Sequence, residues 1–241
     1  MTNKLRVLAV GAHPDDIEIN CGGTLARFAG EGHHVMMAYA TNGEKGHRTI
    51  PPEELAVIRE KEARAAAAII GAEVFWLAFP DGDLFYDRET RLHFVDMIRQ
   101  ARPNLILTHW GETYHPDHIA TSQLVCGASY ISTVPHFKTE HPPCSTVPKI
   151  YYMDVYYGVN AESSEYVDIT PVHEQKKQML AAHASQIVWL RENHNVDLMA
   201  RMIAQDQAIG QKLDPGVSYP GTTYGERFVP RGFRTAKRLL P

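Results

Sequence analysis

Short apolar runs alternate with helix-like segments along the first 155 residues of the chain. Continuous apolar runs of five to eight residues, bounded by turn residues, are typical of strands that are buried on both faces. Such runs lie at residues 5–10, 35–40 and 74–79, and the largely apolar segments 104–108 and 149–155 are also expected to be strands. The pattern therefore predicts five buried strands.

Helical spacing marks most of the intervening segments. The expected helices cover residues 25–29, 51–71, 94–101, 119–130 and, after the last strand, 172–189. Strands that alternate with helices indicate a parallel sheet, and right-handed crossovers make it doubly wound. We expect an α/β fold: a doubly wound, mostly parallel, Rossmann-like sheet with helices on both faces. Residues 135–148 are predicted to form a surface excursion and 214–225 an irregular segment. Residues 1–241 are expected to form a single domain.

The composition narrows the possible classes of protein. A chain of 241 residues with 44% hydrophobic content can bury a sizeable core. The net charge of −4 argues against a nucleic-acid-binding protein, and no apolar stretch is long enough to cross a membrane. The three cysteines show no paired spacing, and the first residues lack a signal-peptide pattern, so we expect a cytoplasmic protein without disulfides.

Two polar loops follow predicted strands and carry the candidate chemistry. The first loop holds His13 and Asp16, and the second, after the fourth strand, holds His118. Because the carboxyl ends of parallel strands meet at one edge of the sheet, these side chains are expected to lie close together. Three nitrogen and oxygen ligands with one open position match a catalytic zinc site, although Fe²⁺ or Co²⁺ would fit similar ligands.

A simpler interpretation exists for both loops. His13 and Asp16 would then only cap the following helix and form an ion pair, and Asp117 would cap the helix after the second loop. The recurrence of His and Asp residues at the ends of two strands favours the metal site.

The loops, together with other segments, resemble the PIG-L/LmbE-like superfamily of zinc-dependent N-acetylglucosamine deacetylases. The matching segments are residues 12–16 with Glu18, then 22–24, 42–44, 59–64, 79–82, 115–118 and 185–186. In length and in residues 224–228, the chain most resembles the bacillithiol-pathway branch, which deacetylates N-acetylglucosaminyl-malate. The resemblance implies a small amino-sugar substrate and a homo-oligomer, either a trimer or a hexamer.

The resemblance also implies roles for the loop residues. The zinc ligands would be His13, Asp16 and His118, and Asp15 would be the general base. A carboxylate beside the ion can accept a proton from water that the ion has made more acidic. His115, held by Asp117, would stabilise the oxyanion or protonate the leaving amine.

Further residues are assigned to substrate binding. Arg59 matches a family position that faces the substrate, where a guanidinium suits an anionic aglycone such as malate. Alternatively, Arg59 is a surface arginine that pairs with Glu60 or Glu62. Glu44 and His47 are expected near sugar hydroxyls.

Tyr114 directly precedes His115 and is expected to donate a hydrogen bond to the oxyanion. His183 and Gln186 are expected to be structural. The histidines expected to have no metal role are His33, His34, His136 and His141.

The sequence therefore predicts a zinc hydrolase that removes acetyl from an N-acetylglucosamine derivative, with the bacillithiol-type substrate favoured. Another amide substrate, such as a chitin disaccharide or an antibiotic intermediate, is the alternative within this class. A non-catalytic nucleotide- or sugar-binding module is the alternative from another class. The chain lacks the glycine-rich and Walker sequences of nucleotide sites, and it retains the residues assigned to catalysis.

Overall fold

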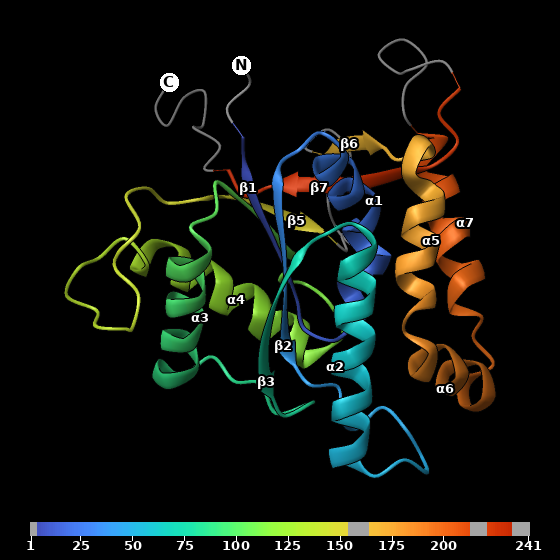
Figure 1. Ribbon diagram of the computed structural model, residues 1–241, viewed down its shortest axis with the longest axis horizontal. Helices are drawn as coiled ribbons and strands as arrows, with labels where there is room; N and C mark the ends of the chain where they lie inside the picture. Colours follow the sequence, from blue (N-terminus) through green and yellow to red (C-terminus); the bar gives the residue numbers. More distant parts are fainter. Residues whose placement is uncertain (1–3, 154–163, 213–220, 233–241) are drawn as a thin grey trace, which may run out of the picture.

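A computed structural model describes residues 4–153, 164–212 and 221–232 of the chain (Figure 1). In these residues seven strands form one sheet in the order β3-β2-β1-β4-β5-β7-β6. The strands are β1 (Arg6–Gly11), β2 (His34–Thr41), β3 (Glu73–Phe79), β4 (Leu105–His109), β5 (Lys149–Met153), β6 (Glu165–Asp168) and β7 (Gly225–Pro230). The pairings from β3 through β5 are parallel, whereas β7 is antiparallel to both β5 and β6.

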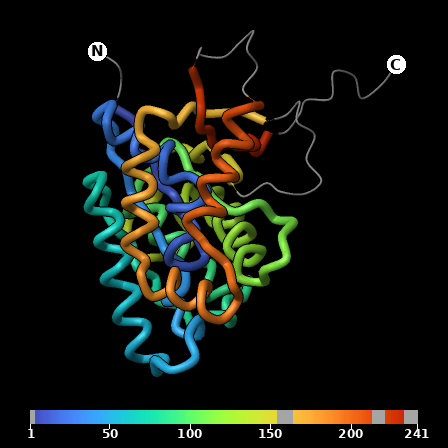
Figure 2. Tube along the Cα trace, turned by 90° about the vertical axis from the view of Figure 1, so that its right-hand side faces the viewer, coloured from blue at the N-terminus to red at the C-terminus, as the bar shows by residue number. Residues whose placement is uncertain are grey.

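Helices cover both faces of this sheet. They are α1 (Asp16–Gly30), α2 (Pro52–Ile69), α3 (Arg88–Ala101), α4 (Pro116–Ile131), α5 (His173–Ala181), α6 (Ala184–His194) and α7 (Leu198–Gly210). Helices α3 and α4 lie on one side, while α1, α2 and α5 lie on the other (Figure 1). Figure 2 shows α5 and α7 running in front of α1, so they form an outer layer on that side. The predicted doubly wound α/β fold is confirmed.

The central strand β1 is apolar on both faces because each face of the sheet meets helices. In β1, Leu8 and Val10 pack in the core beneath α3 and α4, and Val7 and Ala9 pack in the core beneath α1 and α2. All four side chains are fully buried. Successive residues of a strand point to opposite faces, so a strand that is covered on both faces needs apolar residues at every position.

The strand order places a topological switch between β1 and β4. From β1 the chain proceeds outward through β2 and β3, then returns to place β4 on the other side of β1. The loops that follow β1 and β4 therefore diverge at the carboxyl edge of the sheet and leave a crevice, where ligands bind in folds of this kind.

Several predicted elements need correction. Helix α1 begins at Asp16, directly after the first polar loop, rather than at residue 25. The segment 172–189 is not one helix, because the chain leaves helical geometry at His183 and divides into α5 and α6. Helix α7 and strands β6 and β7 were not predicted. Residues 154–155 of the fifth predicted strand, and most of the segment 214–225, lie outside the described residues.

A buried ionic cluster fastens β7 and the outer helices to α1. The carboxylate of Glu226 accepts hydrogen bonds from the N–H groups of Gly23 and Thr24, at 2.9 and 2.8 Å. Nζ of Lys176 lies 2.8 Å from that carboxylate and 2.7 Å from the carboxylate of Asp206. Buried charges need such partners, because moving a charged group out of water without a partner costs several kcal/mol.

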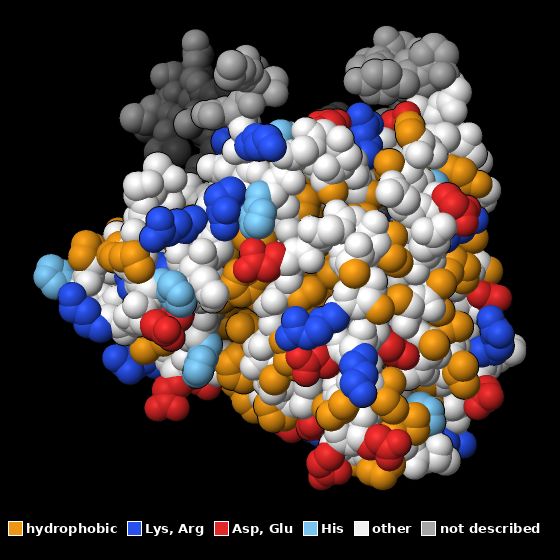
Figure 3. Space-filling model, viewed as in Figure 1, with side chains coloured by type: hydrophobic (Ala, Val, Ile, Leu, Met, Phe, Trp, Pro, Cys, Tyr) orange, Lys and Arg blue, Asp and Glu red, His pale blue; other side chains and the backbone are white. Residues whose placement is uncertain are grey.

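The surface carries charges of both signs. Figure 3 shows Lys and Arg side chains interspersed with Asp and Glu side chains over one face. Among the described residues, no helix has the length and apolar character required to cross a membrane.

Candidate metal centre and active site

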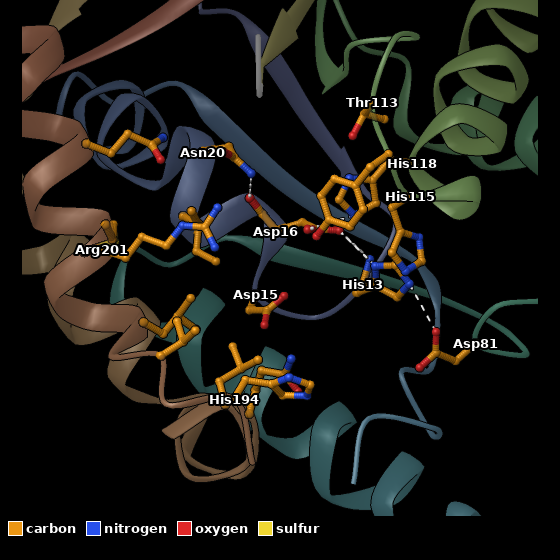
Figure 4. A pocket seen from close by; sticks show the side chains of 18 of the residues that line it. His13, Asp15, Asp16, Asn20, Asp81, Thr113, His115, His118, His194 and Arg201 are labelled. Atoms are coloured by element: carbon orange, nitrogen blue, oxygen red, sulfur yellow. Dashed lines mark hydrogen bonds and ion pairs between the residues drawn. The ribbon is translucent and has the colours of Figure 1, made fainter. Parts of the chain in front are cut away.

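The residues of both polar loops line one cavity of about 730 Å³ at the carboxyl edge of the sheet (Figure 4). One end of the cavity is formed by the loops after β1, β3 and β4, and the opposite wall by α6 and α7. The volume lies within the range of about 300–1,000 Å³ that is typical of small-molecule sites.

Asp15 occupies the turn between β1 and α1 in a strained conformation. Its φ of 109° is in the left-handed region, which residues other than glycine rarely adopt, and it is the N-cap residue of α1. Burial raises the pKa of Asp15 to about 6; the charge of Arg59 opposes this rise and that of Asp16 adds to it. A carboxyl group with a pKa near neutrality at the wall of a cavity is suited to accepting and releasing a proton.

Asp16 lies between three imidazoles. Its Oδ1 is 3.3 Å from Nε2 of His118, and its Oδ2 is 3.2 Å from Nε2 of His109. Oδ2 also lies 3.4 Å from Nδ1 of His13 and accepts the backbone N–H of His13 at 2.7 Å. Burial alone would raise the pKa of Asp16, but the neighbouring imidazoles lower it well below its usual range. Asp16 is therefore ionised, which suits the oxygen ligand that the sequence predicts at this position.

His13 is held by carboxylates on the side facing away from Asp16. Its Nε2 lies 3.1 Å from Oδ2 of Asp117 and 3.2 Å from Oδ1 of Asp81. Burial alone would lower the pKa of His13, but the carboxylates that contact it raise that pKa well above its usual value. Metal-binding histidines commonly have one ring nitrogen held in this way by a carboxylate, which fixes the tautomer and the ring orientation.

The carboxylate of Asp117 contacts His13 and not His115, so the predicted hold of Asp117 on His115 comes from its backbone N–H instead of its side chain. The carboxylate of Asp117 accepts the N–H groups of Gly82 and Leu84 and contacts His13. The N-cap of α4 is His115, whose Nδ1 accepts the backbone N–H of Asp117 at 3.2 Å. Burial, together with the nearby His13 and His118, lowers the pKa of His115.

The residues fit a divalent metal ion. The ligand atoms of His13, His115 and His118 lie within 4.8 Å of one another, as do those of Asp16, His109 and His118. Imidazole nitrogens combined with a carboxylate oxygen are the donor set that zinc prefers in catalytic sites. The assignment of His13, Asp16 and His118 as the ligands stays a prediction that this grouping supports.

Comparison with known proteins agrees with this geometry. The family model described as GlcNAc-PI de-N-acetylase (PIG-L) matches residues 8–129, which include both polar loops. The chain belongs to the PIG-L family.

Named relatives of this PIG-L-family chain include two deacetylases. Diacetylchitobiose deacetylase of Thermococcus kodakarensis is 31% identical over 76% of this chain and 72% of its own length. The 1D-myo-inositol 2-acetamido-2-deoxy-alpha-D-glucopyranoside deacetylase 1 of Catenulispora acidiphila is 30% identical over 65% of this chain. That match covers 58% of the Catenulispora protein.

A solved structure of the family shares the fold over nearly the whole chain. N,N'-diacetylchitobiose deacetylase from Pyrococcus horikoshii superposes with a TM-score of 0.79 and 26% sequence identity. The superposition covers 93% of this chain and 82% of that structure.

Arg59 of this PIG-L-family protein is not the surface arginine of the alternative prediction, because it is only 2% exposed. Its guanidinium donates to the carbonyls of Gly43 and Pro14, at 3.1 and 2.5 Å, and lies 3.5 Å from Asp15. The predicted partners Glu60 and Glu62 instead contact Arg64 and Ser185. Arg59 lines the cavity, but these contacts direct its charge toward Asp15.

The remaining predicted substrate-binding residues lie in different places. Tyr114 lines the cavity, is 85% exposed, and has its ring centre 6.0 Å from that of His115. Glu44 is absent from the described cavity wall and accepts a hydrogen bond from Asn42 at 2.7 Å. His47 packs against Trp189 of α6.

Two site residues, His109 and Asp81, were not assigned from the sequence. His109 is the last residue of β4, is fully buried, and accepts the N–H of Ala12 at 3.0 Å. Asp81 lies in the loop after β3, at the same edge of the sheet. The position of each residue at the carboxyl end of a predicted strand was the available signal.

His183 and Gln186 lie close to the site. Nε2 of His183 is 2.9 Å from Oε1 of Glu18, which also accepts the hydroxyl of Tyr39 at 2.6 Å. His183, Glu18 and Tyr39 are fully buried, consistent with the predicted structural role of His183. Gln186 lines the cavity.

Proposed function

We propose that this protein is a metal-dependent deacetylase that removes the acetyl group from an N-acetylglucosamine unit joined to a second group. The observation that carries this proposal is the arrangement of Asp15, a buried carboxyl group with a raised pKa, beside the cluster of imidazoles around Asp16. The names of the relatives, a diacetylchitobiose deacetylase and an inositol glycoside deacetylase, support the same class of substrate.

The metal site would be formed by His13, Asp16 and His118. A divalent ion there supplies Lewis acidity, which polarises the acetamide carbonyl and makes water more acidic. Asp117 and Asp81 hold the ring of His13 in place.

Proton transfer is assigned to residues of this chain. Asp15, as carboxylate, accepts a proton from the attacking water, and Arg59 keeps part of the Asp15 population ionised near neutral pH. His115 lines the same end of the cavity, and we assign it the role of stabilising the oxyanion or protonating the leaving amine. The raised pKa of Asp15 and its place in the wall of the cavity support this function over a non-catalytic binding module.

Within this class, N-acetylglucosaminyl-malate stays one proposed substrate among several. It rests on the likeness of residues 224–228 to the bacillithiol branch, whereas the named relatives act on diacetylchitobiose or an inositol glycoside. A trimer or hexamer also stays a prediction, which light scattering after gel filtration would test.

The test is release of free amine from a panel of conjugates by protein loaded with Zn²⁺, Fe²⁺ or Co²⁺. The panel contains diacetylchitobiose, the inositol glycoside, N-acetylglucosaminyl-malate and free N-acetylglucosamine. We expect release from at least one conjugate, loss of activity with a chelator, and recovery when metal is restored. If metal-loaded protein released no amine from any conjugate, the proposed function would be wrong.

A further inference from the structure

The cavity has a second region, away from the proposed metal site, whose wall is formed by α6 and α7. Two arginines, Arg59 and Arg201, line the described part of the cavity, and no lysine does. The charge of Arg59 is engaged by two carbonyls and Asp15. Arg201, from α7, is therefore the arginine available to a ligand.

The carboxylates nearest to Arg201 in the sequence are already occupied. Asp197 caps α7 by accepting the N–H of Ala200 at 2.9 Å, and it lies 4.0 Å from Arg191. Asp206 is buried and contacts Lys176 at 2.7 Å. Within the part of the chain that the structure describes, the guanidinium of Arg201 makes no hydrogen bond or ion pair. A guanidinium without an acidic partner is suited to bind an anion.

The side chain of Arg201 points toward the end of the cavity that holds the two polar loops (Figure 4). Figure 4 shows its side chain pointing into the cavity from the wall opposite His115 and Asp81, with Asp15 between the two sides. A substrate whose acetamido group lies near Asp15 would extend its remaining part toward this wall. The cavity of about 730 Å³ has room for a group in addition to one sugar.

We propose that Arg201 is the specificity-determining residue of this site and selects an aglycone that bears an anionic oxygen group, either a carboxylate or a phosphate. This inference rests on the proposed function and assigns the aglycone-binding role to Arg201 instead of Arg59. The planar guanidinium can donate two parallel hydrogen bonds to one such group, which a neutral aglycone matches less well.

The experiment compares matched substrates that differ in charge. N-acetylglucosaminyl-malate is paired with its neutral malate diamide, which is close in shape, and N-acetylglucosamine 1-phosphate is paired with methyl N-acetylglucosaminide. Wild type is compared with Arg201→Gln and Arg201→Lys. The control is Arg191→Gln, because Arg191 is exposed on the neighbouring helix and lies outside the cavity wall. Metal content and circular dichroism verify that all variants are folded and loaded.

We expect wild type to have the higher kcat/KM for the anionic member of at least one pair. Arg201→Gln should reduce that preference by about ten- to a hundredfold, the size expected for losing a charge-assisted hydrogen bond. Arg201→Lys should retain part of the preference, and Arg191→Gln should leave it unchanged. The pair that responds identifies the anion as carboxylate or phosphate.

The possible outcomes distinguish failure of the proposed role of Arg201 from failure of the proposed deacetylase function. Amine release by wild type without preference for either anion, or equal loss on both members of a pair in Arg201→Gln, would overturn the role of Arg201 and leave the deacetylase intact. The absence of amine release from every conjugate would instead remove the proposed function.

Discussion

Nη2 of Arg59 lies 3.5 Å from Oδ2 of Asp15, and both side chains are buried at the wall of the cavity. Burial raises the pKa of Asp15 to about 6, and the guanidinium limits this rise. The same guanidinium is bound to the carbonyls of Gly43 and Pro14, so its position depends on the loops after β1 and β2. Arg59 is thus a positioning residue for the proposed base.

The first prediction tests this dependence through Gly43. Gly43 has a φ of +64°, and a Cβ at this position would collide with the guanidinium of Arg59. Gly43→Ala should therefore displace Arg59 and lower kcat by tenfold or more. Gly71→Ala is the control, because Gly71 has a φ of +67° with open space around it. Both variants should lose about 1–2 kcal/mol of stability from the left-handed backbone, whereas only Gly43→Ala should lose activity. Equal activity in the two variants would contradict the proposed role of Arg59.

The second prediction concerns the metal ligands. His118→Ala should lose most bound metal yet keep its circular dichroism spectrum, because the sheet is held by its apolar core. His34→Ala is the control, since His34 is exposed and pairs with Glu73. Elemental analysis measures the stoichiometry. Full metal occupancy in His118→Ala would rule out His118 as a ligand.

The third prediction separates the two adjacent aspartates. Asp15→Asn should retain the metal but lower kcat by roughly a hundredfold or more, the usual effect of removing a positioned proton acceptor. Asp16→Ala should weaken metal binding instead, because Asp16 contacts the imidazoles of His109 and His118. Metal titrations and kcat measured at saturating metal distinguish these effects. Similar metal loss in both variants would mean that both aspartates coordinate.

The fourth prediction uses Asp206, which is distant in sequence from both polar loops. Burial raises the pKa of Asp206 to about 7, although Lys176 opposes the rise. The folded protein therefore binds a proton at Asp206 that the unfolded chain releases above its ordinary pKa of about 4. This group costs stability above pH 7, and the cost disappears as the pH falls from about 7 toward 4.

The measurement is the free energy of unfolding at several pH values between 8 and 5. Asp206→Asn cannot titrate, so wild type should gain stability relative to this variant as the pH decreases. Glu174→Gln is the control, because Glu174 is an exposed residue of α5 that pairs only with Lys177 among the described residues. A wild-type advantage that is independent of pH would contradict the raised pKa.

The sequence predicted the parts of the fold that depend on local patterns. Apolar runs marked β1 to β3, and largely apolar segments marked β4 and β5, because strands covered on both faces are rich in apolar residues. The break at His183 was not predicted, since it depends on the contact of His183 with Glu18, which is distant in sequence. Strand β7 was missed for a similar reason: its Glu226 is a charged residue whose buried partners, Lys176 and two N–H groups of α1, are distant in sequence.

The site was predictable to the extent that strand ends mark it. The loops after β1 and β4 were placed together correctly, because parallel strands share one carboxyl edge. The partners of individual side chains were not predictable. Asp117 was expected to hold His115 from proximity in sequence, but the start of α4 turns its carboxylate toward His13. The sequence left open the alternative that Arg59 is a surface residue, because the burial of α2 depends on elements elsewhere in the chain.

The contact between Glu226 and α1 has a consequence for how the protein is assembled. The carboxylate joins the N–H groups of Gly23 and Thr24 across 203 and 202 residues of sequence. During synthesis, the helix that begins at Asp16 is complete in sequence long before this partner emerges from the ribosome. Closing the loop of chain between α1 and Glu226 is slow, because the chain loses conformational entropy before it gains the free energy of the contact. We therefore expect the turn at the start of α1, which holds Asp15 and Asp16, to acquire its final rigidity only late in synthesis, after β7 has joined the sheet.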